Sequence, residues 1–175
     1  MFKRILIANR GEIALRIIRT CRDLGIESVL VYSDVDKNSL AVALADKAIC
    51  IGSAVPNESY LDKKKIITAA ILTNSEAIHP GYGFLAENSE FAEMVQKNNL
   101  VFIGADAEVI KSMGDKILAR SIMEKAHVPV IPGSDKINDI DSLKAYASKI
   151  GYPVLLKASQ GGGGKGMRVV NEEND

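Results

Sequence analysis

The stretch RILIANRGEIALRIIRTCRDLGIESVLVYS, residues 4–33, decides the fold. Residues 4–9 and 28–32 are short apolar runs, which are typical of buried strands. Residues 12–24 between them have a helical pattern, and Gly25 is a typical helix stop. The apolar residues expected on one face of this helix are Ile13, Ile17 and Leu24. The order strand, helix, strand predicts two parallel strands joined by a crossover helix.

The same alternation continues to residue 103. Further strands are expected at residues 48–52, 76–78 and 100–103, and further helices at residues 40–46, 61–72 and 89–98. Strands that alternate with helices form parallel sheets with helices on their faces. We therefore expect an α/β fold with a Rossmann-like parallel sheet.

The pattern changes after residue 105. Helices are expected at residues 106–113, 116–126 and 139–149, and the segment VPVIPG, residues 128–133, is typical of a linker. We expect three regions. They are a Rossmann-like domain at residues 1–104, a helical connection at 105–128, and the incomplete start of a second domain at 129–175.

The composition limits the class of protein. The 175 residues include 22 Lys and Arg and 22 Asp and Glu, so no basic field favours a nucleic-acid partner. The first apolar run, residues 5–8, is too short for a signal-peptide core or a membrane span, so we expect a cytoplasmic protein with no membrane contact. Cys21 and Cys50 have no paired spacing and are expected to be small core residues.

A glycine loop joins two more strand-like segments. The loop QGGGGKG, residues 160–166, lies between residues 152–156 and 167–170. Consecutive glycines suit a place where backbone amides approach a ligand, and a lysine beside them suits a polyphosphate. Lys157 ends a segment that reads as a buried strand, where an ammonium needs a partner. The pattern predicts a phosphate-binding flap, and a flexible hairpin tip is the alternative.

Two common nucleotide-binding motifs do not match. A Walker A loop needs G-x-x-x-x-G-K-[ST] before a helix, but Ser159 stands at its first glycine and no Ser or Thr follows Lys165. A dinucleotide fold needs G-x-G-x-x-G after its first strand, whereas residues 9–14 contain one glycine. We therefore expect no NAD site, and we expect Asp34 and Asp36 to be solvent-facing loop residues.

Four motifs together carry a family resemblance. They are IANRGEIA at residues 7–14, HPGYGFLAEN at 79–88, MGDK at 113–116 and the glycine loop. In this order they resemble the biotin carboxylase component of biotin-dependent carboxylases, which belongs to the ATP-grasp superfamily. The resemblance covers the whole chain and implies the amino-terminal portion of a longer carboxylase unit. It implies that residues 129–175 are the incomplete start of an ATP-grasp lid domain.

The resemblance implies an ATP site. Lys116 matches the family lysine that contacts ATP from the helical connection, and Lys157 matches the strand lysine beside the α- and β-phosphates. The flap over the polyphosphate would consist of Gly161, Gly162, Gly163, Gly164, Lys165 and Gly166. Lys165 stands where many members have arginine, so it should act as a point charge.

The resemblance also implies a biotin pocket. Tyr82 and Gly83 match positions that line it, and Glu87 matches a nearby polar residue to which we assign no role. The loop that contains them follows a strand of the expected parallel sheet, at an edge where ligands bind in such folds. A lone histidine is more often structural than catalytic, so we expect His79 to be a hydrogen-bonded structural residue.

The activity implied by the resemblance is the carboxylation of biotin. ATP with Mg²⁺ would activate bicarbonate as carboxyphosphate, and the released CO₂ would carboxylate N1 of biotin on a carrier protein. The metal ligands and the general base would lie outside these 175 residues, so this chain should not catalyse by itself.

The implied partners are a biotin carboxyl carrier protein or domain, a carboxyltransferase component, and a second copy in a homodimer with Arg19 near its interface. Two alternatives remain open: an ATP-grasp ligase of the carbamoyl-phosphate synthetase type, and a non-catalytic truncated module that serves assembly.

Overall fold

The computed structural model describes residues 1–131, 134, 137–157 and 166–174. The chain divides into two compact units, Met1–Gly114 and Asp115–Asp175. The expected division into three regions remains a prediction. Among the described residues, no helix has both the length and the apolar character needed to cross a membrane.

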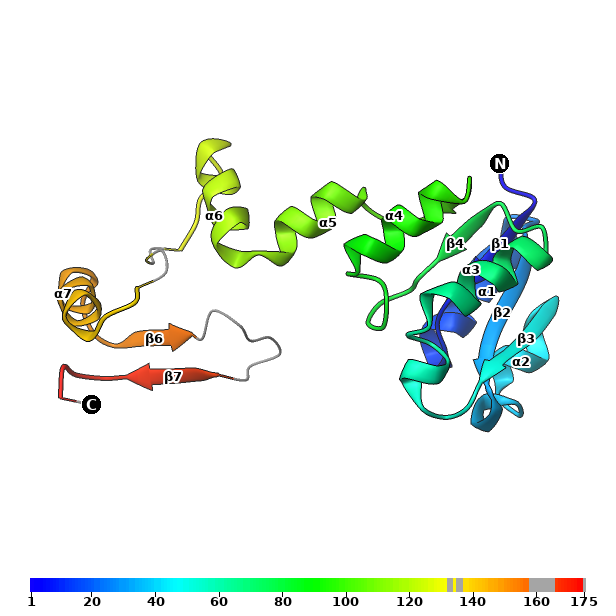
Figure 1. Cartoon of the computed structure of the whole chain (residues 1–175), viewed down its shortest axis with the longest axis horizontal. Helices are drawn as coiled ribbons and strands as arrows, with labels where there is room; N and C mark the ends of the chain where they lie inside the picture. The colour runs from blue at the N-terminus through cyan, green and yellow to red at the C-terminus, as the bar shows by residue number, and fades with distance from the viewer. Residues whose placement is uncertain (132–133, 135–136, 158–165, 175) are drawn as a thin grey trace. The chain divides into compact units, whose positions relative to one another are not determined.

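A five-stranded sheet forms the centre of the first unit, with the strand order β3-β2-β1-β4-β5 (Figure 1). The strands are β1 (Arg4–Ile7), β2 (Glu27–Ser33), β3 (Lys47–Gly52), β4 (Ala77–His79) and β5 (Val101–Phe102). The helices are α1 (Gly11–Asp23), α2 (Leu40–Leu44), α3 (Lys63–Leu72), α4 (Ser89–Lys97) and α5 (Ala107–Gly114), with 3₁₀ turns at Asp34–Asp36 and Pro56–Glu58. All neighbouring strands are parallel, which confirms the expected α/β class.

Helices cover both faces of this sheet (Figure 1). On one face, side chains of α3 and α4 pack with Leu6 of β1 and Val29 of β2. On the other face, side chains of α1 and α2 pack with Ile5 and Ile7 of β1. Successive residues of β1 thus enter opposite cores, as the two-residue period of a strand requires. Such a central strand has no exposed face, which explains its uninterrupted apolar sequence.

Two expected core residues are exposed, so these predictions were wrong. Leu24 is 52% exposed because it follows the last turn of α1, where the chain turns through Gly25 at φ +67°. Cys50 is exposed because β3 is an edge strand. Ile51, the next residue along β3, enters the core with α3, so Cys50 points to the other face.

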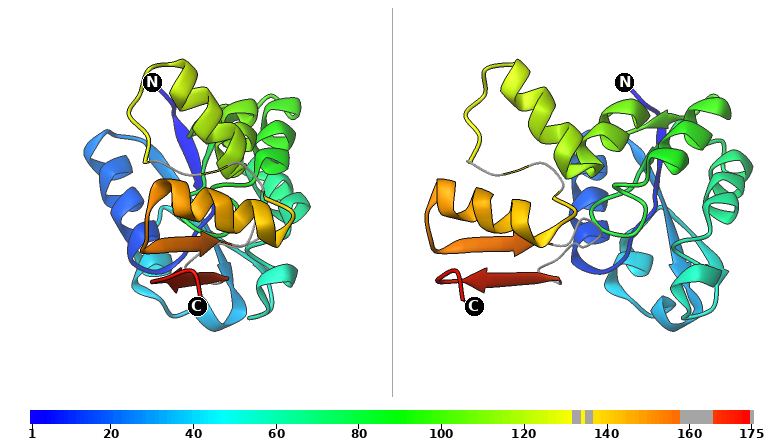
Figure 2. Two further views of the ribbon diagram at one scale, coloured as in Figure 1. Left: turned by 90° about the vertical axis from the view of Figure 1, so that its left-hand side faces the viewer. Right: turned by 60° about the vertical axis from the view of Figure 1, so that its left-hand side comes forward.

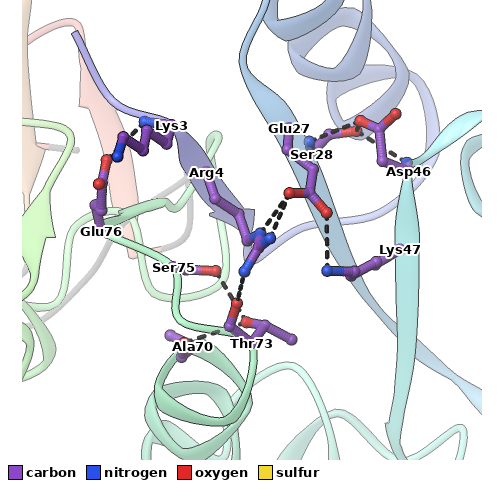
Figure 3. Close-up of polar contacts among 10 residues, drawn as sticks. All are labelled: Lys3, Arg4, Glu27, Ser28, Asp46, Lys47, Ala70, Thr73, Ser75 and Glu76. Atoms are coloured by element: carbon purple, nitrogen blue, oxygen red, sulfur yellow. Dashed lines mark hydrogen bonds and ion pairs between the residues drawn. The ribbon is translucent and has the colours of Figure 1, made fainter.

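Charged side chains connect the amino-terminal ends of the strands (Figure 3). The guanidinium of Arg4 donates to Glu27 and to the carbonyl of Thr73, and Lys47 pairs with Glu27 at 2.9 Å. Hydrogen bonds from Lys47 first, and then from Arg4, hold the pKa of Glu27 below its ordinary value. Glu27 therefore joins β1 to β3 across its own strand, β2.

The second unit contains α6 (Lys116–Lys125), α7 (Ile140–Ile150) and the antiparallel strands β6 (Val154–Lys157) and β7 (Met167–Val170). The helix α7 lies across one face of the β6–β7 pair (Figure 2). Ala147 of α7, Val154 and Val170 form its small buried core. Strands β6 and β7 form a sheet of their own, separate from the five-stranded sheet.

The opposite face of the β6–β7 pair is exposed. Leu155 and Val169 face each other in register there, and Lys157 faces Met167. Lys157 is exposed, so our interpretation of it as a buried ammonium was wrong. Alternation along β6 places Val154 and Leu156 under α7 and Lys157 on the other side.

Candidate functional site

The loops after β1 and β4 meet at the carboxyl-terminal edge of the sheet. These two strands are neighbours, but the chain leaves β1 for α1 on one face and leaves β4 for α4 on the other. Ligands of open α/β sheets bind where neighbouring strands diverge in this way. The candidate site in the first unit is therefore formed by residues 9–12 and 79–88.

Asn9 holds the two loops together. Its side chain donates from Nδ2 to the carbonyls of Pro80, at 2.7 Å, and Tyr82, at 2.8 Å, and its Oδ1 accepts from the amide of Arg10. Asn9 is only 3% exposed. Gly81 lies against this amide at φ +65°, and a Cβ there would be 2.8 Å from Nδ2. The side chain of Asn9 thus occupies the place where a dinucleotide fold brings backbone to pyrophosphate.

His79 is hydrogen-bonded within its own loop. Its Nδ1 accepts from the amide of Gly81 at 3.0 Å. Burial lowers the pKa of His79, which favours the neutral imidazole that this acceptor role requires. These contacts are those of a structural histidine.

Tyr82 and Gly83 present the accessible part of the loop. Tyr82 is 58% exposed, and its hydroxyl donates to Glu12 of α1, which raises the pKa of Tyr82. Gly83 has φ +67°, and a Cβ there would meet open space. Glu87 is exposed. The two residues that the family resemblance assigns to a biotin pocket are thus accessible to a ligand.

A polar network lies beside this loop. The carboxylate of Asp36 accepts from Arg10 through Nε at 2.7 Å and Nη2 at 2.5 Å, from Ser33 at 2.9 Å and from the hydroxyl of Tyr60 at 2.7 Å. The hydrogen bond from Arg10, supported by those from Tyr60 and Ser33, lowers the pKa of Asp36 to about 2. Burial, and then the bond to Asp36, raises the pKa of Tyr60 to about 12.

Sequence reasoning missed this network. We expected Asp36 to face solvent with Asp34, but its side chain is only 12% exposed. The difference arises because Arg10 and Tyr60 converge on Asp36 from other parts of the chain. An isolated tyrosine 24 residues away leaves no local pattern that predicts such a contact. The available signal was an acid three residues after the end of β2, a place where α/β folds often carry a ligand-binding acid.

The aromatic ring of Tyr60 connects the network to the loop. It stacks on Phe84 with a centroid distance of 5.0 Å and an interplanar angle of 18°. Phe84 has φ +39°, which is unusual for a residue other than glycine. Leu85, the next residue, is buried in the core with α3 and α4.

The predicted nucleotide-binding residues lie in the second unit. Lys116 is the first residue of α6, whose amino-terminal end is capped by the Asp115 carboxylate. Lys157 and Gly166 lie at the two ends of the connection between β6 and β7. The predicted flap residues Gly161, Gly162, Gly163, Gly164 and Lys165 lie outside the described residues. From its run of glycines we expect this flap to be mobile without ligand, and this expectation also concerns residues outside the described ones. In the part that the structure describes, no three His, Cys, Asp or Glu side chains form a group suited to a metal ion.

Comparisons with known families divide the chain near the same place as its two units. Residues 1–110 match the family described as "Biotin carboxylase, N-terminal domain". Residues 115–175 match the family described as "Carbamoyl-phosphate synthase L chain, ATP binding domain".

Individual relatives match over the whole chain. Biotin carboxylase 1 of Bacillus subtilis (strain 168) is 52% identical over 176 residues, which cover 100% of this chain and 39% of that protein. The biotin carboxylase of Haemophilus influenzae is 54% identical, over 99% of this chain and 39% of that protein. The solved biotin carboxylase–βγ-ATP complex from Campylobacter jejuni matches with a TM-score of 0.94 and 51% identity, over 100% of this chain and 40% of that one. The chain thus spans about two fifths of the length of these relatives.

Proposed function

Because the chain belongs to the biotin carboxylase family, we propose that it supplies the amino-terminal part of an enzyme that carboxylates carrier-bound biotin with ATP and bicarbonate. The observation that carries this proposal is the match of both units, in order, to relatives named biotin carboxylase. The metal ligands and the general base would come from beyond these 175 residues, so we expect no catalysis by the chain alone. The enzyme would be cytoplasmic.

We assign the nucleotide to the exposed face of the β6–β7 pair. Leu155, Met167 and Val169 form an apolar surface there, with Lys157 at one end. An apolar surface suits a planar base, and an ammonium beside it suits phosphate oxygens. The base would lie on this face and the phosphates would extend past Lys157 toward the flap. Phosphoryl transfer depends chiefly on positioning and charge neutralisation, which lysines and a closing lid provide.

The remaining ATP contacts follow the family pattern. Lys116 would reach the nucleotide from the start of α6, and the backbone of Gly163 and Gly164 would cover the polyphosphate. Lys165 would add a charge to the flap. Mg²⁺ would neutralise the phosphate oxygens and would be held by carboxylates outside this chain.

We assign biotin to the loop after β4. Tyr82 and Gly83 are exposed at the edge where such sheets bind ligands, and Asn9 fixes the backbone on either side of Gly81. A fixed backbone lets a site recognise a small ring without the cost of ordering a loop.

The proposed partners are a biotin carboxyl carrier protein or domain, a carboxyltransferase component and a second copy of the chain. Arg19 is exposed on α1, where a planar guanidinium could pair with a carboxylate across a dimer interface. Charge reversal at Arg19 in the full-length protein should shift its sedimentation toward the monomer, and unchanged sedimentation would remove Arg19 from the interface.

A ligase of the carbamoyl-phosphate synthetase type is the second candidate, because residues 115–175 match the ATP-binding domain of that name. Both candidates would use ATP, so ADP formation that depends on biotin would separate them. The assembly module without catalysis would bind no nucleotide.

The experiment that tests the nucleotide site is Lys157→Ala in the full-length enzyme, with Lys144→Ala on α7 as a matched exposed lysine. A charge-assisted hydrogen bond contributes roughly 1.5–3 kcal/mol, so Lys157→Ala should weaken ATP use by about ten- to more than a hundredfold. Because Lys157 is exposed, the melting temperature of the Lys157→Ala variant should match that of the Lys144→Ala variant. A large drop in melting temperature with normal bicarbonate-dependent ATPase kinetics would overturn the phosphate role.

A further inference from the structure

Tyr60 contacts both a polar network and a loop, and its position is fixed by the network. It is 3% exposed, and its hydroxyl donates to Asp36 at 2.7 Å while accepting from the amide of Ser33 at 2.9 Å. Asp36 is in turn held by two bonds from Arg10. The hydroxyl thus has a donor and an acceptor in fixed places, which leaves the ring one orientation.

The ring of Tyr60 meets the loop where its backbone is least favourable. Phe84 has φ +39°, and a left-handed conformation costs an ordinary side chain free energy that its surroundings must offset. Stacking on Tyr60 and the burial of the adjacent Leu85 provide this stabilisation. The conformation of Phe84 sets the direction of the chain that follows Tyr82 and Gly83.

The loop is therefore held on two sides. Asn9 binds the backbone carbonyls of Pro80 and Tyr82, and Tyr60 stacks on Phe84. Gly83 is exposed between these contacts, and the side chain of Tyr82 is also exposed. The hydrogen bond from Tyr82 to Glu12 adds a third contact, to α1.

We propose that Tyr60, oriented by Asp36 and Arg10, is a positioning residue that holds Tyr82 and Gly83 in the geometry needed to bind biotin. The proposal rests on the biotin role of this loop proposed above. Tyr60 does not touch the substrate; it acts through Phe84. Asp36 and Arg10 act one step further away, by fixing the hydroxyl of Tyr60.

The test compares four variants of the full-length protein. Tyr60→Phe keeps the stacked ring and removes the hydroxyl, and Phe84→Leu removes the stack. Phe102→Leu is the control, because Phe102 belongs to the other aromatic pair, with Phe91, in the core between the sheet and α4. Phe84→Tyr keeps the ring and should behave as the unmodified protein does.

Two readouts are needed, the KM for free biotin and the hydrogen exchange of amides 81–86. In Phe84→Leu the KM for free biotin should rise about three- to tenfold, the size expected from the loss of one aromatic pair. Tyr60→Phe should change both readouts in the same direction by a smaller factor. Phe102→Leu should lower the melting temperature without a selective change in either readout.

The outcomes separate this inference from the proposed function. Exchange of amides 81–86 that is no faster in Phe84→Leu and Tyr60→Phe than in Phe102→Leu would overturn the positioning role. Faster exchange with an unchanged KM for biotin would support the positioning role of Tyr60 and would overturn the biotin role of the loop. If Phe84→Leu does not fold, Tyr60→Phe alone decides, because it removes one hydroxyl and keeps the packing.

Discussion

The two ends of the five-stranded sheet are both rich in side-chain contacts, but the contacts at one end join strands and those at the other end hold a loop. At the amino-terminal end, Glu27 bridges Arg4 and Lys47, which joins one strand to another (Figure 3). At the carboxyl-terminal end, Asn9 and Tyr60 contact the loop after β4.

Burial separates the two ends as well. Glu27 is 32% exposed and Lys47 is 48% exposed by side chain, whereas Asn9 and Tyr60 are each 3% exposed. Exposed ion pairs contribute little to stability because water screens them, whereas a buried polar group that loses its partner is costly. We infer that the amino-terminal contacts stabilise the sheet weakly and that the carboxyl-terminal contacts fix the shape of a loop.

The largest effect is expected from Asn9→Ala. It leaves the carbonyls of Pro80 and Tyr82 without their donor, and we expect a loss of about 2–4 kcal/mol in the free energy of unfolding. Urea denaturation of the first unit measures this loss. Asn98→Ala, which removes an exposed hydrogen bond to Met94, is the control and should cost under about 1 kcal/mol. Equal losses in the two variants would contradict the difference between buried and exposed polar contacts on which the comparison rests.

The pair Gly81→Ala and Gly83→Ala sharpens the comparison within the loop. Both glycines have positive φ, so each alanine should cost roughly 1–2 kcal/mol from backbone strain. Gly81→Ala should cost more, because its Cβ would lie 2.8 Å from Nδ2 of the buried Asn9, whereas Gly83→Ala meets open space. Thermal unfolding of both variants checks the order. A Gly83→Ala variant less stable than Gly81→Ala would contradict it.

Asp36→Asn tests the polar network through its pH dependence. The pKa of Asp36 is lowered from 3.8 to about 2, chiefly by Arg10. The carboxylate charge therefore stabilises the folded protein fully at pH values above the ordinary pKa of 3.8, and this stabilisation is lost as the pH falls toward the pKa of the folded protein. The stability difference between the unmodified protein and Asp36→Asn should therefore be constant from about pH 8 to 5 and should shrink only below about pH 4. A difference that shrinks between pH 8 and 5 would refute the assignment.

The smallest effect is expected from Arg4→Leu at the amino-terminal end. Glu27 keeps Lys47 as a partner, and the pKa of Glu27 should move back toward 4.5. The resulting stability loss should be smaller than that of Asn9→Ala, should fall in high salt, and should shrink as the pH drops below about 4.5. Denaturation at two salt concentrations measures it. A salt-independent loss as large as that of Asn9→Ala would show that the contacts at the two ends contribute equally to stability, which would contradict the comparison.

Much of the first unit could be predicted from the sequence, because its strands are buried on both faces and its helices end at clear signals. Gly25 and the apolar run of β1 are examples. The exposure of Cys50 could not be predicted, since strand order decides which strand is at the edge. The exposure of Lys157 was missed for a related reason: among the described residues, β6 is covered on one face, by α7.

The position of the loop after β4 could be predicted because its residues are close in sequence. Tyr82 and Gly83 follow a strand within one motif, whereas the contacts of Asn9 with Tyr82 and of Asp36 with Tyr60 span 73 and 24 residues. Such contacts depend on tertiary packing, and no local pattern encodes them. The roles of Tyr82 and Gly83, of Lys116 and Lys157, and of the flap stay predictions.

The position of β1 at the centre of the sheet has a consequence for how the chain is made. Ile5 pairs with Ser28 of β2 on one side and with Ala77 of β4 on the other. A growing chain can complete the first pairing early, but the second must wait until residues 77–79 have left the ribosome. At common translation rates, the synthesis of residues 34–79 takes roughly 2–9 s. Throughout that time, a strand whose Leu6 and Ile7 are fully buried in the finished protein has an open edge, which is a template for association with neighbouring nascent chains.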